Sequence, residues 1–183
     1  VAKMATTLDV ISRGRAICGI GAAWYDVEHV GLGFDFPRDG VRLDMLEEAL
    51  QICRAMFTEE TPTFTGEHYR IQDAHNLPRP LRGDIPILVG GGGEKRTLRL
   101  VAQYADACNV HGDPDMIRHK MAVIDRHCAD VGRDPSEVRR TWGGTLFLTE
   151  TAEEAAGIEG LLRPAAGDEY DHNFIVEIGR AHV

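Results

Sequence analysis

The sequence lacks any run of eighteen or more apolar residues, so it predicts no membrane-spanning helix. It also lacks a surplus of positive charge, since 20 Lys and Arg stand against 29 Asp and Glu, for a formal net charge of -9. An acidic chain has little with which to gather nucleic-acid phosphates, and we expect neither a nucleic-acid nor a membrane partner. The first residues, VAKMATTLDVISRGR, contain no apolar core segment and do not resemble a signal peptide.

Cysteine is scarce, and its placement excludes the usual metal and redox motifs. Cys18, Cys53, Cys108 and Cys128 are far apart in the sequence, and no Cys-x-x-Cys pair occurs. The eight histidines show no spacing that gathers ligands, so we expect no metal site. We interpret the cysteines as buried free thiols of a protein in the reducing cytoplasm.

Two common nucleotide-binding motifs are missing as well. The dinucleotide fingerprint Gly-x-Gly-x-x-Gly fails at Gly19-x-Gly21 and at Gly91-x-Gly93, because Trp24 and Arg96 occupy the third glycine position. No Gly-Lys-Ser or Gly-Lys-Thr occurs, which excludes a P-loop.

What the sequence does have is an alternation of short apolar runs with amphipathic stretches. The runs predict buried strands, and apolar stripes at helical spacing predict helices. In order, the expected elements are a helix over 2–12, a strand within 15–24, a loop up to 40, a helix over 43–57, a hairpin over 62–74, a strand over 85–90, a helix over 94–105, a strand over 106–112, a helix over 114–131, a strand over 138–149 that a glycine pair could interrupt, and a helix from 151. This order indicates a parallel sheet, either open and doubly wound or closed as a (β/α)8 barrel. A full barrel needs about 250 residues, so four strands predict about half of one.

Four consecutive glycines, Gly90 to Gly93, stand where a predicted strand is followed by a predicted helix. Glycine permits unusual backbone angles and lets a ligand approach the main chain. The start of the following helix offers unpaired N–H groups and partial positive charge, which together favour a phosphate. Lys95, Arg96 and Arg99 would add positive charge. A tight turn that binds no ligand is the alternative interpretation.

Four stretches, in this order and spacing, resemble the luciferase-like monooxygenase family, especially its branch of oxidoreductases that use the deazaflavin coenzyme F420. They are AKMATTLDVISRGRAICGIGAAW, FPRDGVRLDMLEEALQICRAMF, PTFTGEHYRIQDA and PILVGGGGEKRTLRLVAQYADACNV, and the resemblance covers roughly residues 2–148. It implies an α/β fold, a partial TIM (β/α)8 barrel of the bacterial luciferase-like type with about half of the barrel present. The implied domain is residues 1–176. We expect residues 177–183 to be a non-native tail, because one back-translation of EIGRAHV resembles sequencing-adapter DNA.

The resemblance also implies a flavin or deazaflavin at the carboxyl ends of the strands. The glycine run would hold its phosphate, the strand end at 21–24 would line the ring pocket, and Asn109 would lie beside the phosphate or the substrate. Ala23 stands where the family more often has glycine, and its methyl group would narrow the pocket. We expect Gly92→Val to weaken cofactor binding through backbone strain and a blocked approach. The implied cofactor-binding residues are Gly21, Ala22, Trp24, Gly90, Gly91, Gly92, Gly93, Glu94 and Asn109.

The function implied by the resemblance is that of an oxidoreductase that moves a hydride between coenzyme F420 and a small organic substrate. Three alternatives stay open: an FMN-dependent monooxygenase of the same family that uses O2, a barrel that binds a phosphate ligand without redox chemistry, and a non-catalytic binding protein. No residue is assigned a catalytic role, because the family's acid–base groups would lie on earlier strands. His111, at a predicted strand end, is a candidate for substrate contact or a polar residue of the rim. A homodimer is compatible with the complete protein.

Overall fold

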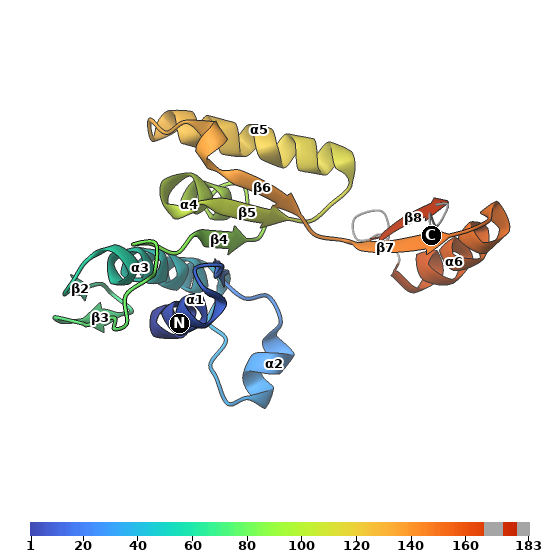
Figure 1. The fold of residues 1–183 in the computed structure, drawn as a ribbon. Helices are drawn as coiled ribbons and strands as arrows, with labels where there is room; N and C mark the ends of the chain where they lie inside the picture. The colour runs from blue at the N-terminus through green and yellow to red at the C-terminus, as the bar shows by residue number, and fades with distance from the viewer. Residues whose placement is uncertain (167–173, 179–183) are drawn as a thin grey trace.

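The computed structural model describes residues 1–166 and 174–178 of the chain (Figure 1). Its helices and strands follow the order that the apolar periodicity predicts. They are α1 (Ala2–Ser12), β1 (Cys18–Ile20), α2 (Asp26–Gly31), α3 (Asp39–Thr58), β2 (Phe64–Thr65), β3 (Arg70–Ile71), β4 (Ile87–Gly90), α4 (Thr97–Tyr104), β5 (Ala107–Val110), α5 (Pro114–Asp130), the 3-10 turn η1 (Pro135–Glu137), β6 (Arg139–Trp142), β7 (Thr145–Thr149), α6 (Ala152–Ala166) and β8 (Phe174–Ile178).

Four strands form one parallel sheet in the order β1-β4-β5-β6. The register places Ile20 of β1 opposite Val89 of β4, and Val89 opposite Cys108 of β5. Each crossover between neighbouring strands contains a helix, as parallel pairing requires. Helix α4 packs against both α3 and α5, so the three helices form a layer beside the sheet. The predicted alternation and the parallel sheet are therefore confirmed.

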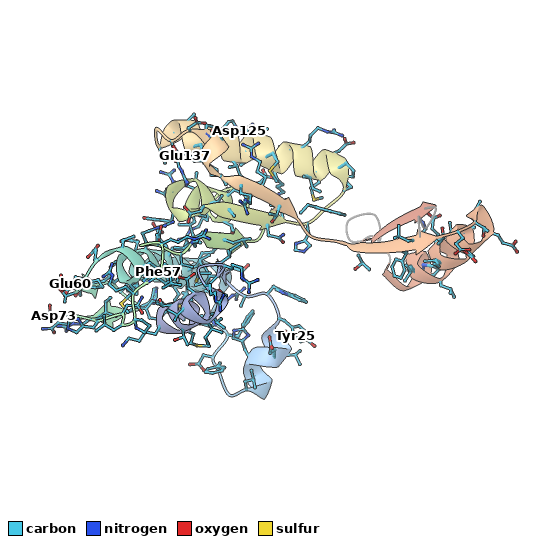
Figure 2. The ribbon with its side chains drawn as sticks, in the orientation of Figure 1. Tyr25, Phe57, Glu60, Asp73, Asp125 and Glu137 are labelled. Atoms are coloured by element: carbon cyan, nitrogen blue, oxygen red, sulfur yellow. The ribbon has the colours of Figure 1, made fainter. Side chains whose placement is uncertain are left out.

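The main core lies between this sheet and the helices. Ile87 and Val89 of β4 are fully buried, whereas Leu88 and Gly90 are only partly buried and face the other side of the sheet. Burial of one large apolar side chain stabilises a fold by about 1.5–3 kcal/mol. The helix-covered face thus provides the main apolar contribution to stability. The fully buried apolar side chains include Leu50, Phe57 (labelled in Figure 2), Ile85, Ile87, Val89, Leu98, Val101, Val110 and Ile124.

Some elements differ from the sequence-based expectation. The expected loop before residue 40 contains α2, whose six residues are too few to show a periodicity. Helix α4 begins at Thr97 instead of residue 94, because residues 94–96 form a turn. The stretch 138–149 is two strands, since β6 belongs to the main sheet and β7 pairs in parallel with β8. Figure 1 shows β7, α6 and β8 projecting from the rest. Glu177 and Ile178 belong to β8, and residues 179–183 of the expected tail lie outside the described residues.

All four cysteines are buried and free, as the sequence predicts. The fold nevertheless brings two of them together, because Cys18 of β1 and Cys53 of α3 share a thiol hydrogen bond. This hydrogen bond lowers the pKa of Cys18 and raises the pKa of Cys53. The first strand and the longest helix are therefore joined by a polar contact inside the apolar core.

Among the described residues, no helix is both long enough and apolar enough to cross a membrane.

One carboxylate fixes the β2–β3 hairpin to α3. Glu48 of α3 accepts hydrogen bonds from the N–H groups of Glu67 (2.6 Å), His68 (3.0 Å) and Tyr69 (2.8 Å) at the hairpin turn. Gly66 lies so close that a Cβ there would be 2.3 Å from this carboxylate. Desolvation alone would raise the pKa of Glu48, but the N–H donors outweigh it and keep the pKa below its ordinary value.

Replacing Glu48 with glutamine should loosen the hairpin, because a neutral amide accepts weaker hydrogen bonds than a carboxylate. Since the folded pKa is lowered, the ionised carboxylate stabilises the fold at neutral pH, and this stabilisation is lost as the pH falls through the lowered pKa. We therefore expect Glu48→Gln to lower the melting temperature at neutral pH and to have less effect in acid. The exposed Glu60 provides the control variant Glu60→Gln. Equal losses from both variants at neutral pH would contradict the role of Glu48.

Candidate functional site

The carboxyl ends of parallel strands meet at one edge of the sheet, and expected cofactor-binding residues lie there. Gly21 follows β1, Gly90 ends β4, and Asn109 lies near the end of β5. Gly21 and Gly90 are adjacent, because a Cβ on Gly21 would lie 3.2 Å from the Gly90 carbonyl oxygen. Asn109 is the register partner of Gly90, and its Nδ2 donates a 2.9 Å hydrogen bond to Thr141 Oγ1 of β6. The fold thus brings residues from three strands side by side.

The glycine run leaves β4 in a defined conformation. The Gly91 N–H donates a 3.0 Å hydrogen bond to the Asn109 carbonyl, and the φ of Gly91 is +123°, which side chains rarely adopt. Gly93 faces Thr97, whose Oγ1 would lie 2.9 Å from a Cβ on Gly93. Gly92 has open space by comparison, and its φ lies outside the left-handed region. The backbone strain expected at Gly92 is therefore wrong, because the strained position is Gly91, whereas the expected weakening of cofactor binding by Gly92→Val stays a prediction.

Three consecutive N–H groups remain available for an anion. Within the part of the chain that the structure describes, the amides of Gly92, Gly93 and Glu94 donate no hydrogen bond to a protein acceptor. Gly92 and Gly93 directly precede the turn at 94–96, which leads into α4, whose first N–H groups carry partial positive charge. Phosphate oxygens accept several such hydrogen bonds at once, so this amide cradle fits a phosphate. The cradle is narrower than the sequence predicts, because the Gly91 amide belongs to the sheet.

Glu94 is anchored to α5 through both its side chain and its main chain. Its Oε1 accepts a hydrogen bond from Lys120 Nζ at 2.7 Å and lies 3.2 Å from His119 Nε2. Its carbonyl oxygen lies 2.8 Å from His127 Nε2, which is therefore the protonated ring nitrogen. Lys120, and then His119, hold the pKa of the Glu94 carboxyl below its ordinary value. These contacts fix the position at which the glycine run ends.

A cation that the local sequence does not identify approaches the glycine run. Lys120 Cε would lie 3.7 Å from a Cβ on Gly92. Arg96, which the sequence places beside the expected phosphate, instead pairs with Asp44 of α3 at 2.7 Å. The available sequence signal for Lys120 is its position next to the partly buried Ile117 on the inward stripe of α5. A long side chain at such a position is partly buried and directed by its neighbours.

Arg42 of α3 holds the end of β1. Its Nε donates to the Ala22 carbonyl at 3.0 Å, and its guanidinium also donates to the Pro37 carbonyl and pairs with Asp39 at 2.8 Å. Its Cζ lies 3.9 Å from the centre of the Phe36 ring, a cation–π contact. One partly buried guanidinium thus connects the strand end to the loop that follows it.

A cavity of about 200 Å³ lies between the end of β1 and α3. Gly21 and Ala22 line it, whereas residues 90–94 do not. The expected ring-pocket residues and the amide cradle therefore form two neighbouring surfaces, which meet where Gly21 touches Gly90. Trp24 lies outside the cavity, 85% exposed, with its ring 5.3 Å from that of Tyr25. Figure 2 shows Tyr25 at the start of α2, away from the main sheet.

His111 follows β5 and is exposed at the rim. Its Nε2 would lie 2.6 Å from a Cβ on Gly143, so the segments that follow β5 and β6 pack closely there. In residues 1–166 and 174–178, no three His, Cys, Asp or Glu side chains are grouped to hold a metal ion. The site therefore offers main-chain N–H donors at the glycine run, the ammonium of Lys120 beside them and the guanidinium of Arg42 at the cavity.

Ala23 has a φ of +62°, in the left-handed region, where a side chain costs roughly 1–2 kcal/mol. We expect Ala23→Gly to raise the free energy of unfolding by about 0.5–1 kcal/mol. The strain relieved in the folded state should exceed the free-energy cost of the larger conformational entropy that glycine gives the unfolded chain. Ala22→Gly is the control, and it should lower the free energy of unfolding. Urea unfolding measures both, and a less stable Ala23→Gly variant would refute the interpretation.

Known proteins share sequence or fold with the chain. It is 38% identical over 107 residues to an F420-dependent glucose-6-phosphate dehydrogenase of Intrasporangium calvum, which covers 57% of this chain and 30% of that protein. It is 30% identical over 141 residues to the pyrimidine monooxygenase RutA of Allorhizobium ampelinum, which covers 73% of this chain and 38% of that protein. The coenzyme F420-dependent tetrahydromethanopterin reductase from Methanopyrus kandleri superimposes with a TM-score of 0.77 at 18% identity, over 93% of this chain and 52% of that chain.

The chain thus spans about a third of the length of these curated relatives and about half of the solved structure. Its four parallel strands and their helices form about half of a luciferase-like TIM (β/α)8 barrel, as the sequence predicts. The similar proteins include both oxidoreductases and monooxygenases. The family described as luciferase-like monooxygenase matches residues 1–158, and the chain belongs to it.

Proposed function

We propose that the chain is part of an oxidoreductase that transfers a hydride between coenzyme F420 and a small organic substrate. The observation that carries the proposal is the row of unpaired N–H groups at Gly92, Gly93 and Glu94 beside the ammonium of Lys120. Such a cradle suits the phosphate of the coenzyme. The similarity to an F420-dependent dehydrogenase supports F420 as the coenzyme.

The geometry of the strand ends supports a proposal for the cofactor contacts. The phosphate would lie on the amides after Gly91. The Gly91 N–H is not available to it, because it donates to the Asn109 carbonyl, and Gly91 instead fixes the backbone conformation of the run. The ring would lie toward Gly21 and Ala22, where Gly21 lies against the Gly90 carbonyl and nothing lies within 4 Å of a Cβ on Gly90. The contacts are assigned to Gly21, Ala22, Trp24, Gly90, Gly91, Gly92, Gly93, Glu94 and Asn109.

The chain's own part in the reaction is binding and orientation. A bound deazaflavin would supply the hydride chemistry. Glu94, held by α5, keeps the amide cradle in place, and Arg42 keeps the end of β1 in place. Anchoring the ligand at one end in this way lowers the entropic cost of aligning the ligand with a substrate.

An FMN-dependent monooxygenase that uses O2 is the second candidate. The similarity to a pyrimidine monooxygenase favours it. The amide cradle accepts the phosphate of FMN as well as that of F420, and it would also suit a phosphate ligand that undergoes no redox chemistry. For each of these candidates we propose a small-molecule ligand, with no nucleic-acid or membrane partner.

Coenzyme binding separates these candidates. The protein to use is one of full family length that carries this chain, titrated with F420 and with FMN and followed by absorbance. We expect F420 to bind more tightly, with a spectrum at shorter wavelength than that of a flavin. Binding of FMN alone would replace the proposal with the monooxygenase, and binding of neither would reject both redox candidates.

Gly92→Ala tests the amide cradle itself. The added methyl group has ordinary contact distance to Lys120, so the fold should keep its melting temperature. The methyl group would keep a phosphate from the amides, and we expect affinity for F420 or FMN to fall about tenfold, as for one or two lost hydrogen bonds. Gly157→Ala in α6, where nothing lies within 4 Å of the new Cβ, is the control and should leave affinity unchanged. Equal affinity of Gly92→Ala and the wild type would reject the cradle.

A further inference from the structure

Lys120 reaches the glycine run from α5, although the two are distant in the sequence. Its Cε would lie 3.7 Å from a Cβ on Gly92, and its Nζ lies 2.7 Å from Glu94 Oε1. Its side chain is 17% exposed. The ammonium is therefore held between α5 and the run instead of extending into solvent.

Other contacts keep α5 at this distance. His119 approaches the Glu94 carboxylate, and His127 donates to the Glu94 carbonyl oxygen. Helix α5 also packs along α4, the helix that the glycine run leads into. Because three residues of one helix hold Glu94, Lys120 stays at the run in a defined position.

The charge of Glu94 gives Lys120 a role beyond a salt bridge. Glu94 supplies one amide of the cradle, so its carboxylate would repel an anion bound there. Lys120 neutralises this carboxylate. An ammonium carries three N–H donors and Glu94 Oε1 takes one of them, so donors remain for a second acceptor beside Gly92.

We propose that Lys120 makes the site select a phosphate-bearing coenzyme over its phosphate-free counterpart, by donating from its ammonium to a phosphate held on the amides of Gly92 and Gly93. The inference rests on the proposed function, because it requires an anion at the glycine run. Main-chain amides supply hydrogen bonds to a phosphate, whereas Lys120 supplies a full positive charge that a neutral sugar-like chain does not need.

The test compares pairs of ligands that differ at the phosphate. In a protein of full family length that carries this chain, dissociation constants are measured for FMN and riboflavin, and for the deazaflavin riboside 5′-phosphate and the deazaflavin riboside. Lys120→Met should lower the affinity for the phosphate-bearing ligand about tenfold, as for the loss of one charge-assisted hydrogen bond. It should lower the affinity for the phosphate-free ligand by less than about twofold. Equal weakening of both ligands would indicate a structural role and overturn the proposal.

Two further variants control for charge and for position. Lys120→Arg keeps the cation and should restore most of the lost affinity. Arg118→Met removes a cation of the same helix whose side chain is 74% exposed and paired with Asp115. This variant should leave the affinity for both ligands unchanged. If Arg118→Met reproduced the loss, the effect would be one of net charge and the proposal would fail.

A double variant separates direct contact from the neutralisation of Glu94. If Lys120 binds the phosphate, the double variant Glu94→Gln/Lys120→Met should still bind the phosphate-bearing ligand with lower affinity than the wild type. If Lys120 acts only by neutralising Glu94, the double variant regains the wild-type affinity, and the proposed contact is rejected.

Inorganic phosphate distinguishes failure of this inference from failure of the proposed function. If the wild type binds neither coenzyme, the proposed function fails, but phosphate titration followed by the NMR shifts of the Gly92 and Gly93 amides still tests Lys120. Weaker phosphate binding by Lys120→Met then supports the assignment. Unchanged binding in that variant, or no binding by the wild type, overturns it.

Discussion

The hydrogen bond from the Gly91 N–H to the Asn109 carbonyl is the constraint on which the candidate site depends. It continues the pairing of β4 with β5 by one residue, so the chain leaves the sheet at Gly92. The chain must then turn before α4 begins at Thr97, and the N–H groups of the turn have no strand to pair with. The unpaired amides follow from the point at which strand pairing ends. Glycine is required beside them because Gly91 has a φ of +123° and Gly93 lies against Thr97.

Contacts from α5 make this turn rigid. A glycine run alone has much conformational freedom in solution, and ordering it on binding would weaken the affinity for a ligand. Contacts from Lys120, His119 and His127 hold Glu94 at the end of the run, and the sheet holds Gly91 at its start. The amides between these two fixed points are thus ordered before any ligand binds. The apolar packing of α4 and α5 therefore contributes to the site as well as to stability.

Much of the fold could be predicted from the sequence, because apolar periodicity reports directly which face of an element is buried. Asp113 before Pro114 likewise indicates the start of α5, and its carboxylate does accept from the N–H groups of Asp115 and Met116. The position of the glycine run at a strand end follows from the same pattern. The partners of charged side chains could not be predicted from this pattern, because they depend on contacts between distant segments. Arg96 pairs with Asp44 of α3, and the cation at the run comes from α5. The division of 138–149 between two sheets also depends on pairing with a distant strand.

A net charge of -9 is unfavourable for a site that binds an anion, yet distance limits its effect. At physiological ionic strength the Debye length is about 8 Å, so exposed carboxylates farther away than this are largely screened. The charges that matter are those within a few ångströms of the cradle. There the Glu94 carboxylate is paired with Lys120 and contacted by His119, and within the described residues the amides of Gly92, Gly93 and Glu94 donate no hydrogen bond to a protein acceptor. An acidic chain can therefore hold an anionic ligand, and the arrangement of a few neighbouring groups determines which anion it accepts.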